Sequence, residues 1–188
     1  CALPILFGAT IPQAYGGLGL PASTYAKIVI LISEVWMSLT GIFNSHLIMA
    51  LAVEKFGTER QKLHWLPKFA TGEIRGGLAL TEPDAGTDLQ SIRMVAKRDG
   101  NEGYVLNGTK TWISAVARAR WLVTFATLDP AAGRKGITAF LLEPQWAGIT
   151  RTPFKNKVGF RPLESGELVL DNVRVPVANR LGEEGEGF

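Results

Sequence analysis

The sequence predicts an α+β fold, in which an N-terminal helical segment is followed by an antiparallel β-barrel or sandwich domain. Two observations carry this prediction: apolar runs of helical length fill residues 22–72, and short strand-like stretches separated by turn residues follow from Ile74 onwards. We place the boundary beside Gly76 and Gly77. The expected division is a partial helical domain over residues 1–77 and a β-domain over residues 78–188.

Composition describes an ordinary globular chain. It has 188 residues, 46% of them hydrophobic and 20% charged, which is enough for one domain or two small ones. The net charge of +3 comes from scattered Lys and Arg residues, so no basic run with interleaved aromatics indicates nucleic-acid binding. A mild positive surplus suits an anionic substrate.

Cysteine and histidine usage limits the possible metal and redox chemistry. Cys1 is the only cysteine, so we expect no disulfide and a reducing compartment. His46 and His64 lie too far apart for a HExxH pair, and we predict no metal. The start at Cys1 and the stop at Phe188, just after a Gly-rich turn, suggest a piece of a longer protein.

The helical region is expected to contain two long helices. A short apolar segment over Cys1–Ala9 leads into the Gly-rich loop Ile11–Leu20, and Pro21–Ser23 then signals a helix start. The apolar run Ala26–Met37 is too hydrophobic for a fully exposed helix. Gly41 is predicted to separate it from the second helix.

The second helix raises the question of a membrane span. Val35–Val53 contains no charged residue, and about 20 apolar residues are needed to cross a bilayer. Small and polar residues interrupt the run, so we expect a buried helical hairpin and no membrane span. His46 is then expected to be a satisfied histidine on a packing face, with a ligand contact as the alternative.

A third helix is predicted over Glu59–Thr71. Gly57 closes the preceding helix, and Thr58 with Gln61 three residues later forms a capping box. The apolar face of this helix is expected to pack in the core, and Gly72 ends the helix.

The β-domain is expected to begin with a hairpin. Tyr104–Leu106 and Thr109–Ile113 have strand composition and flank Asn107–Gly108, a strong turn signal. Trp121–Thr127, Ile137–Glu143 and Glu167–Val175 are predicted as further strands. Short, frequent strands of this kind favour an antiparallel sheet that folds towards a barrel or sandwich.

Two stretches form the candidate ligand site: Leu78–Asp88, LALTEPDAGTD, and Lys110–Ser114, KTWIS. Leu78–Leu80 has the pattern of the end of a buried strand, which Pro83 and Gly86 then break. Such a junction exposes unpaired backbone N–H groups and hydroxyls, which suit a planar, acceptor-rich ligand or a phosphate. An ordinary strand-to-loop junction is the other interpretation of these residues.

TEPDAGTD, LNGTKTWIS, KGITAFLLE, ELVLDNVRVP and GEEGEGF, in this order, resemble the acyl-CoA dehydrogenase family. The resemblance covers Leu78–Phe188 without a large gap and, more loosely, Ile11–Gly77. It implies FAD as the cofactor and acyl-CoA as the substrate, with the residue at Thr87 contacting both. The flavin-binding residues it implies are Leu78, Ala79, Leu80, Thr81, Gly86, Thr87, Trp112, Ile113 and Ser114.

Other nucleotide-binding motifs fail. No GxGxxG follows a strand and opens a helix, which argues against a Rossmann mode of binding. Gly103–Lys110 has Thr109 where a P-loop needs lysine, and the Asn107–Thr109 sequon is better explained as a turn. The final GEEGEGF is expected to be a flexible connection, because its acidic residues would repel phosphate.

The resemblance also implies the reaction. A carboxylate removes the proton alpha to the thioester while hydride passes to the flavin, giving the 2,3-enoyl-CoA of fatty acid metabolism. In the family that carboxylate lies beyond the position of Phe188, so we assign no catalytic residue here. Glu82 and Asp84 are expected to stabilise the turn. Ala115 and Leu163 depart from the family pattern, which often has Asn and a small polar residue there.

Several further expectations follow from the family. The electron acceptor is expected to be electron-transfer flavoprotein, and the full-length protein a homo-oligomer, either dimer or tetramer, in the bacterial cytoplasm or the mitochondrial matrix. The 188-residue chain alone is expected to bind FAD weakly. Alternatives are an acyl-CoA oxidase or flavin monooxygenase of the same fold, or a non-catalytic flavin- or acyl-binding relative.

Overall fold

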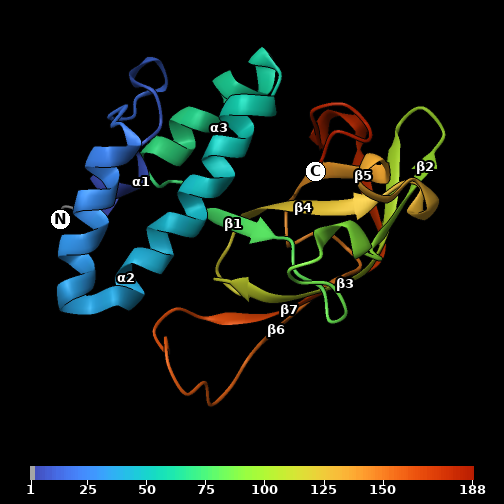
Figure 1. Cartoon of the computed structure of the whole chain (residues 1–188). Coiled ribbons are helices and arrows are strands. Elements are labelled where there is room, and N and C mark those ends of the chain that lie inside the picture. Colours follow the sequence, from blue (N-terminus) through green and yellow to red (C-terminus); the bar gives the residue numbers. More distant parts are fainter. Residues whose placement is uncertain (1–2) are drawn as a thin grey trace.

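Helices gather on one side of the molecule and strands on the other (Figure 1). The computed structural model describes residues 3–188, so Cys1 and Ala2, the start of the predicted segment Cys1–Ala9, lie outside the described residues. The helices are α1 (Leu3–Phe7), α2 (Ala22–Phe56) and α3 (Glu59–Ala70), with 3₁₀ turns η1 (Gln13–Tyr15), η2 (Leu89–Ser91), η3 (Pro130–Gly136) and η4 (Val177–Asn179). The strands are β1 (Gly76–Ala79), β2 (Val95–Asp99), β3 (Gly103–Ser114), β4 (Trp121–Thr127), β5 (Ile137–Leu142), β6 (Ile149–Pro153), β7 (Ser165–Pro176) and β8 (Arg180–Leu181).

The two predicted long helices are the two limbs of α2, which form a V in Figure 1. The break falls at Trp36, whose φ of −159° and ψ of 89° are extended, so the prediction that Gly41 separates the helices is wrong. A helix tolerates one glycine at a cost of about 1 kcal/mol. At Gly41 the glycine serves packing, because a Cβ there would lie 2.5 Å from Cδ2 of Leu163.

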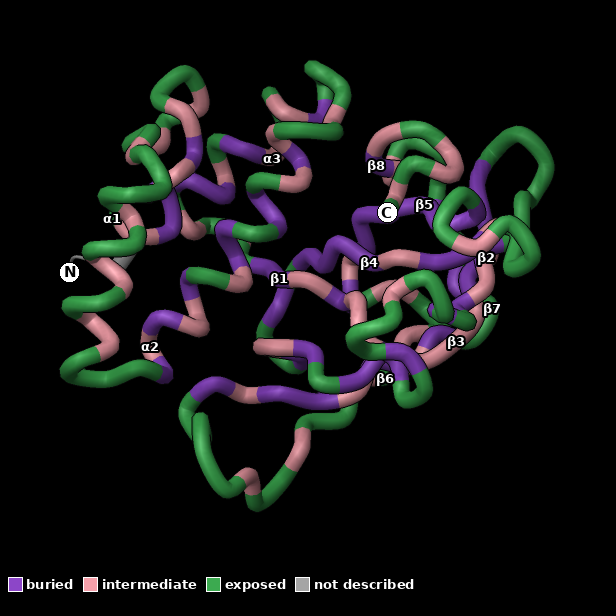
Figure 2. The backbone as a smooth tube through the Cα atoms, in the orientation of Figure 1, coloured by how far each residue is buried: buried purple, intermediate pink, exposed green. Residues whose placement is uncertain are grey.

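The two limbs of α2 differ in burial (Figure 2). The buried residues of α2 all belong to the second limb, from Ser38 to Val53, whereas Val35 in the first limb is 89% exposed. By length and composition α2 could cross a membrane, although a buried core helix or a leader sequence satisfies the same criterion. The absence of a membrane span stays a prediction.

Helix α3 has the predicted N-terminus. The hydroxyl of Thr58 accepts a hydrogen bond from the Gln61 amide at 3.2 Å, and the Gln61 side-chain oxygen accepts one from the Thr58 amide at 2.8 Å. The capping box is therefore confirmed. Gln61 also donates to the carbonyls of Ala178 and Arg180, both at 2.9 Å, which ties the start of α3 to the end of the β-domain.

The mostly antiparallel sheet confirms the predicted fold class, but the sheet is not closed into a barrel. Its pairing order runs β6-β7-β3-β2-β4-β5-β8, which leaves β6 and β8 as edges, and β1 pairs with β4 in parallel. The predicted strands over 121–127, 137–143 and 167–175 correspond to β4, β5 and β7. Strands β2, β6 and β8 were not predicted.

The predicted hairpin at Asn107–Gly108 is wrong, because β3 runs without interruption from Gly103 to Ser114. Gly108 instead occupies a register shift between β3 and β7, with φ of +146°. A β-bulge requires unusual backbone angles just as a turn does, so the same dipeptide fits both. The actual turn links β2 to β3 through Gly100, whose φ is +59°.

Two buried cores share strands β4 and β5. Trp121 and Val123 pack against the helices, whereas Leu122 and Ala126 face the interior of the curved sheet. Alternation of side chains along a strand explains why neighbouring residues enter different cores. The helices and the sheet thus meet in one of the two cores, and the division at residue 77 stays a prediction.

His46 joins the helices to the first strand. Its ring is fully buried between Phe7 and Phe69; Nε2 lies 3.0 Å from the Phe69 carbonyl, and Nδ1 lies 3.4 Å from the Gly76 amide nitrogen. This pattern requires a neutral ring that donates from Nε2 and accepts at Nδ1. Burial lowers the pKa of His46 to about 4. His46 is therefore a histidine with both ring nitrogens satisfied on a packing face, as we expected.

Candidate functional site

The two predicted ligand stretches lie side by side. The Thr111 amide donates to the Thr81 carbonyl at 2.8 Å, and a Cβ atom at Gly77 would lie 3.5 Å from the Ser114 carbonyl oxygen. The end of β3 therefore runs antiparallel to the segment from β1 to Thr81. Thr81 and Ser114 stand near opposite ends of this shared edge, about 10 Å apart for three strand residues.

The first stretch changes from buried to exposed along its length. Ala79 is fully buried, Leu78, Leu80 and Thr81 are half-buried, and Gly86 and Thr87 are exposed. The turn is closed by a pair of backbone hydrogen bonds between Glu82 and Ala85. Within the turn, Glu82 and Ala85 stay buried, whereas the residues from Gly86 to Asp88 lie at the surface.

Glu82 stabilises this turn from inside, as expected. One carboxylate oxygen accepts from the Arg93 amide at 2.5 Å, and the other accepts from the Met94 amide at 3.0 Å. Asp84, by contrast, makes an exposed ion pair with Arg93 at 3.1 Å. Both oxygens of Glu82 are engaged, so the carboxylate is poorly placed to remove a substrate proton.

Lys110 is the residue of this site that the sequence analysis did not single out. Its side chain is completely buried, and Nζ donates to Glu82 at 2.7 Å and to the Leu80 carbonyl at 3.1 Å. Burial lowers the pKa of Lys110, and the Glu82 carboxylate opposes that shift. The available signal was its register, because Lys110 follows Tyr104 and Leu106 on the inward face of a strand.

Two residues, one within the second stretch and one just after it, have left-handed backbone. Trp112 has φ of +59° at a register shift of β3, and Ala115 has φ of +55° just after the strand. The bulge turns the Trp112 side chain outwards, where it is 63% exposed and packs edge-on against Phe154 at 4.8 Å. Outliers of this kind concentrate at functional sites.

The last two residues of this stretch differ in what they can offer a ligand. Ile113 is buried, with 2% of its surface exposed, and its side chain belongs to the core inside the sheet. It can present only its backbone. Ser114 is half-buried and pairs with Ser165 of β7.

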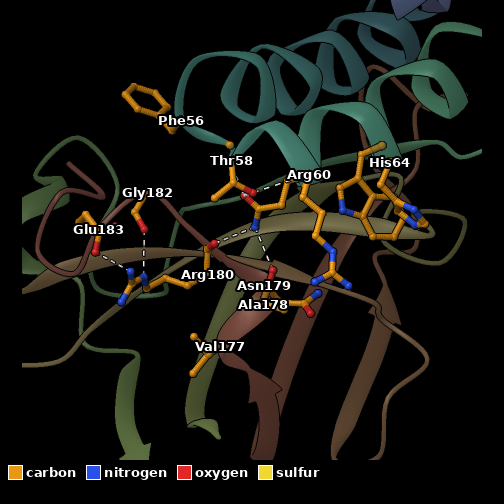
Figure 3. A pocket seen from close by; sticks show the side chains of 13 residues that line it. Phe56, Thr58, Arg60, His64, Val177, Ala178, Asn179, Arg180, Gly182 and Glu183 are labelled. Atoms are coloured by element: carbon orange, nitrogen blue, oxygen red, sulfur yellow. Dashed lines mark hydrogen bonds and ion pairs between the residues drawn. The ribbon is translucent and has the colours of Figure 1, made fainter. Parts of the chain in front are cut away.

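Two cavities flank the β-domain. One of about 700 Å³ begins beside the shared edge, at Gly76 and Ala115, and is walled by Leu163. The other, of about 580 Å³, lies between the start of α3 and the η4–β8 segment, and Figure 3 shows the residues that line it. There Gln61 donates to the backbone carbonyls of Ala178 and Arg180. None of the nine predicted flavin residues lines either cavity. Within residues 3–188 there is no cluster of three or more His, Cys, Asp or Glu that could hold a metal.

The geometry fits a flat ring that needs hydrogen-bond donors. Along the shared edge, half-buried Thr81 and half-buried Ser114 stand near opposite ends, and the indole of Trp112 on β3 is exposed. None of the described hydrogen bonds uses the Thr81 N–H, so that donor is open. An aromatic side chain beside open donors is suited to hold a planar heterocycle.

Family comparisons agree with the sequence motifs. The family described as "Acyl-CoA dehydrogenase, middle domain" matches residues 77–173, and "Acyl-CoA dehydrogenase, N-terminal domain" matches residues 6–73. Acryloyl-CoA reductase (NADH) from Anaerotignum propionicum is 41% identical over 97% of the chain, and glutaryl-CoA dehydrogenase from Desulfococcus multivorans is 37% identical over 96%. The chain covers 47% of each, so it spans about half the length of these curated relatives.

Solved structures show the same fold. A prolyl acyl carrier protein oxidase has a TM-score of 0.92 and 35% identity, covering all of this chain and 50% of its own. A glutaryl-CoA dehydrogenase bound to glutaryl-CoA has a TM-score of 0.91 and 36% identity, with 97% and 47% covered. An acyl-CoA dehydrogenase from Bacillus anthracis, complexed with FAD, has a TM-score of 0.88 and 35% identity, with 98% and 32% covered.

Proposed function

Because the chain belongs to the acyl-CoA dehydrogenase family, we propose that it is part of an FAD-dependent enzyme that oxidises an acyl-CoA thioester to the 2,3-enoyl-CoA. FAD is the cofactor that the relatives support. The observation that carries the proposal is the shared edge between Leu78–Thr81 and Trp112–Ser114, which has the open Thr81 N–H on one segment and an exposed indole on the other.

In this proposal, the chain holds the flavin with the residues that the family motifs indicate. Bound FAD would supply the hydride acceptor of the reaction. The N–H and hydroxyl of Thr81, with those of Ser114, would donate to the ring where negative charge develops, and Trp112 would pack against it. Leu78, Ala79, Leu80 and Ile113 would contribute backbone or apolar walls, and Gly86 and Thr87 would form the exposed part of the site, with Thr87 also touching the acyl-CoA.

The remaining parts of the mechanism lie outside these residues. No catalytic base is assigned here, since Glu82 is committed to two amides and Lys110. Electron-transfer flavoprotein as acceptor and a homo-oligomeric full-length protein belong to the same proposal. So does a location in the bacterial cytoplasm or mitochondrial matrix; similar proteins occur in a bacterium and in plant mitochondria.

The test uses the full-length protein with FAD and a panel of acyl-CoA thioesters. Anaerobic addition of a substrate should bleach the oxidised flavin spectrum and yield the enoyl-CoA. If no acyl-CoA bleaches it, the substrate class is wrong. A weakly retained flavin is expected for the 188-residue chain alone, so yellow protein that survives gel filtration would contradict that part of the prediction.

A pair of threonine variants tests the shared edge. Thr81→Val removes a hydroxyl of the proposed site and should slow flavin bleaching on the order of 10-fold, the worth of a hydrogen bond of about 1.4 kcal/mol. Thr124→Val is the matched control, because the Thr124 hydroxyl is buried in β4 without a partner. Equal rates for the two variants would remove Thr81 from the site.

A second candidate function is a same-fold oxidase that acts on an acyl group carried by a protein. The similarity to a prolyl acyl carrier protein oxidase, which covers the whole chain, favours keeping this candidate. Rapid oxygen consumption by the reduced full-length protein would support the oxidase, whereas slow reoxidation supports the dehydrogenase. A full-length sequence without a catalytic carboxylate would favour the non-catalytic relative instead. Hydroxylation of a substrate would favour a flavin monooxygenase.

A further inference from the structure

The Lys110–Glu82 ion pair is the most deeply buried charged group in the described chain. The side chain of Lys110 is 0% exposed and that of Glu82 is 5% exposed, whereas every other ion pair includes a side chain that is at least 20% exposed. A buried ion pair contributes little net stability, because desolvation offsets most of the attraction. Its position in the fold therefore calls for another explanation.

The pair holds the backbone on which the proposed flavin contact depends. Lys110 Nζ binds the Leu80 carbonyl at 3.1 Å, and the carbonyl of Leu80 and the amide N–H of Thr81 belong to one planar peptide group. In a trans peptide these two groups point in opposite directions. Lys110 thus fixes the Thr81 N–H so that it points away from the ion pair.

The neighbouring peptide is fixed from the same strand. The Thr111 amide donates to the Thr81 carbonyl at 2.8 Å, so both peptide groups that flank Thr81 are held by β3. Glu82 in turn is anchored by the amides of Arg93 and Met94. The open Thr81 N–H is therefore set in a rigid frame.

The charge adds to this orientation. A hydrogen bond from an ammonium group is stronger than one from a neutral donor, and hydrogen bonds in a chain polarise one another. An ammonium on the Leu80 carbonyl draws electron density through the peptide and makes the Thr81 N–H a better donor. A leucine or methionine in place of Lys110 could fill the same space but could not do this.

We propose that Lys110, held by Glu82, is a positioning residue that orients and polarises the Leu80–Thr81 peptide, so that the Thr81 N–H stabilises the reduced flavin more than the oxidised one. This inference rests on the proposed flavin site. Lys110 acts through the peptide and touches neither the ring nor the substrate.

The test measures the midpoint potential of FAD bound to the full-length protein. Lys110→Met should weaken binding of reduced flavin relative to oxidised flavin about 10-fold, a shift of about −30 mV for a two-electron couple. The double variant Lys110→Met/Glu82→Leu removes both charges and should show the same shift in a folded protein. Leu106→Ala on β3 is the control, since Leu106 is buried in the sheet core and forms no part of the ion pair; it should lose stability with an unchanged potential.

The outcomes separate the two proposals. If wild-type protein fails to hold FAD, the flavin site itself is wrong. If wild-type protein holds FAD and the double variant keeps the wild-type potential and absorption spectrum, the role of Lys110 is overturned while the site stands. A shift as large in Leu106→Ala as in Lys110→Met would also overturn it, because general loosening of the sheet would then explain both.

Discussion

A buried titratable residue holds each end of strand β1, and the two residues differ in charge. At the start, neutral His46 accepts from the Gly76 amide; just beyond the end, charged Lys110 donates to the Leu80 carbonyl and pairs with Glu82. A lone buried base avoids the cost of desolvation by losing its proton, whereas a paired one keeps its charge. Charge is thus retained only at the end that faces the proposed flavin contact.

The difference teaches that burial alone does not reveal function. His46 is as buried as Lys110, yet its two ring nitrogens satisfy backbone groups at the joint between helices and sheet. A neutral hydrogen bond suffices to hold that joint. The ion pair at the other end requires a carboxylate, an ammonium and two backbone amides, a costlier arrangement where structure alone would accept an apolar side chain.

The largest expected effect comes from breaking the ion pair on one side. Glu82→Leu leaves Lys110 buried without its partner and removes the acceptor for the Arg93 and Met94 amides. Loss of one partner of a buried pair costs about 3–5 kcal/mol. The full-length protein should therefore unfold at a clearly lower temperature or urea concentration.

The double variant Lys110→Met/Glu82→Leu sharpens this test. It removes the unpaired charge, so it should recover a large part of the lost stability and leave mainly the cost of the two free amides and of the Leu80 carbonyl that Lys110 no longer binds. If the double variant is no more stable than Glu82→Leu, the isolated lysine is not what destabilises the single variant.

The next largest effect is the pH dependence at the His46 end. The folded pKa of about 4 lies below the ordinary value of 6.5, so the unfolded chain binds the proton first as pH falls. The contribution of neutral His46 is fully present above pH 6.5 and is lost progressively down to about pH 4. At 1.36 kcal/mol for each pKa unit the loss amounts to about 3 kcal/mol.

His46→Gln provides the control, because glutamine keeps a donor and an acceptor without titrating in this range. The difference in stability between wild type and His46→Gln should shrink as pH falls from 7 to 4, while carboxylates titrate equally in both proteins. The pKa itself can be read from the imidazole signals by NMR. A constant difference across this range would show that His46 keeps its ordinary pKa in the folded state.

Local sequence signals predicted the elements that depend on nearby residues. The capping box at Thr58 and Gln61 satisfies its donors within one helical turn, so three residues of spacing were enough. The strands β4 and β5 could be predicted because each is a short run of apolar residues and threonine, which favour strands. Such features need no knowledge of distant parts of the chain.

The errors arose where tertiary packing chose between two local options. Gly41 could end a helix or allow a side chain to pack closely against the helix. Its close contact with the Leu163 side chain shows the second. Asn107–Gly108 could form a turn or a bulge, and pairing of β3 with β7 favoured the bulge. The ion pair of Lys110 could not be predicted, because its partner Glu82 lies 28 residues away in the sequence and local patterns do not extend that far.

The smallest effect concerns Ala115, beside the His46-held end of the shared edge. Its φ of +55° costs an L-amino acid with a Cβ about 1–2 kcal/mol, whereas glycine adopts it freely. Ala115→Gly should therefore raise the stability of the full-length protein by about 0.5–1 kcal/mol, after the added entropy of the unfolded glycine is subtracted. Ala117→Gly, two residues on and without a positive φ, is the matched control and should lower stability slightly.

The thermal midpoints of both variants test the effect of strain at Ala115. A gain in stability at both positions, or at neither, would mean that left-handed strain at Ala115 does not limit the stability of this end of the edge. A gain in stability for Ala115→Gly alone, without a change in flavin potential, would show that the strain at Ala115 affects only stability and is not coupled to the Lys110–Glu82 end of the edge.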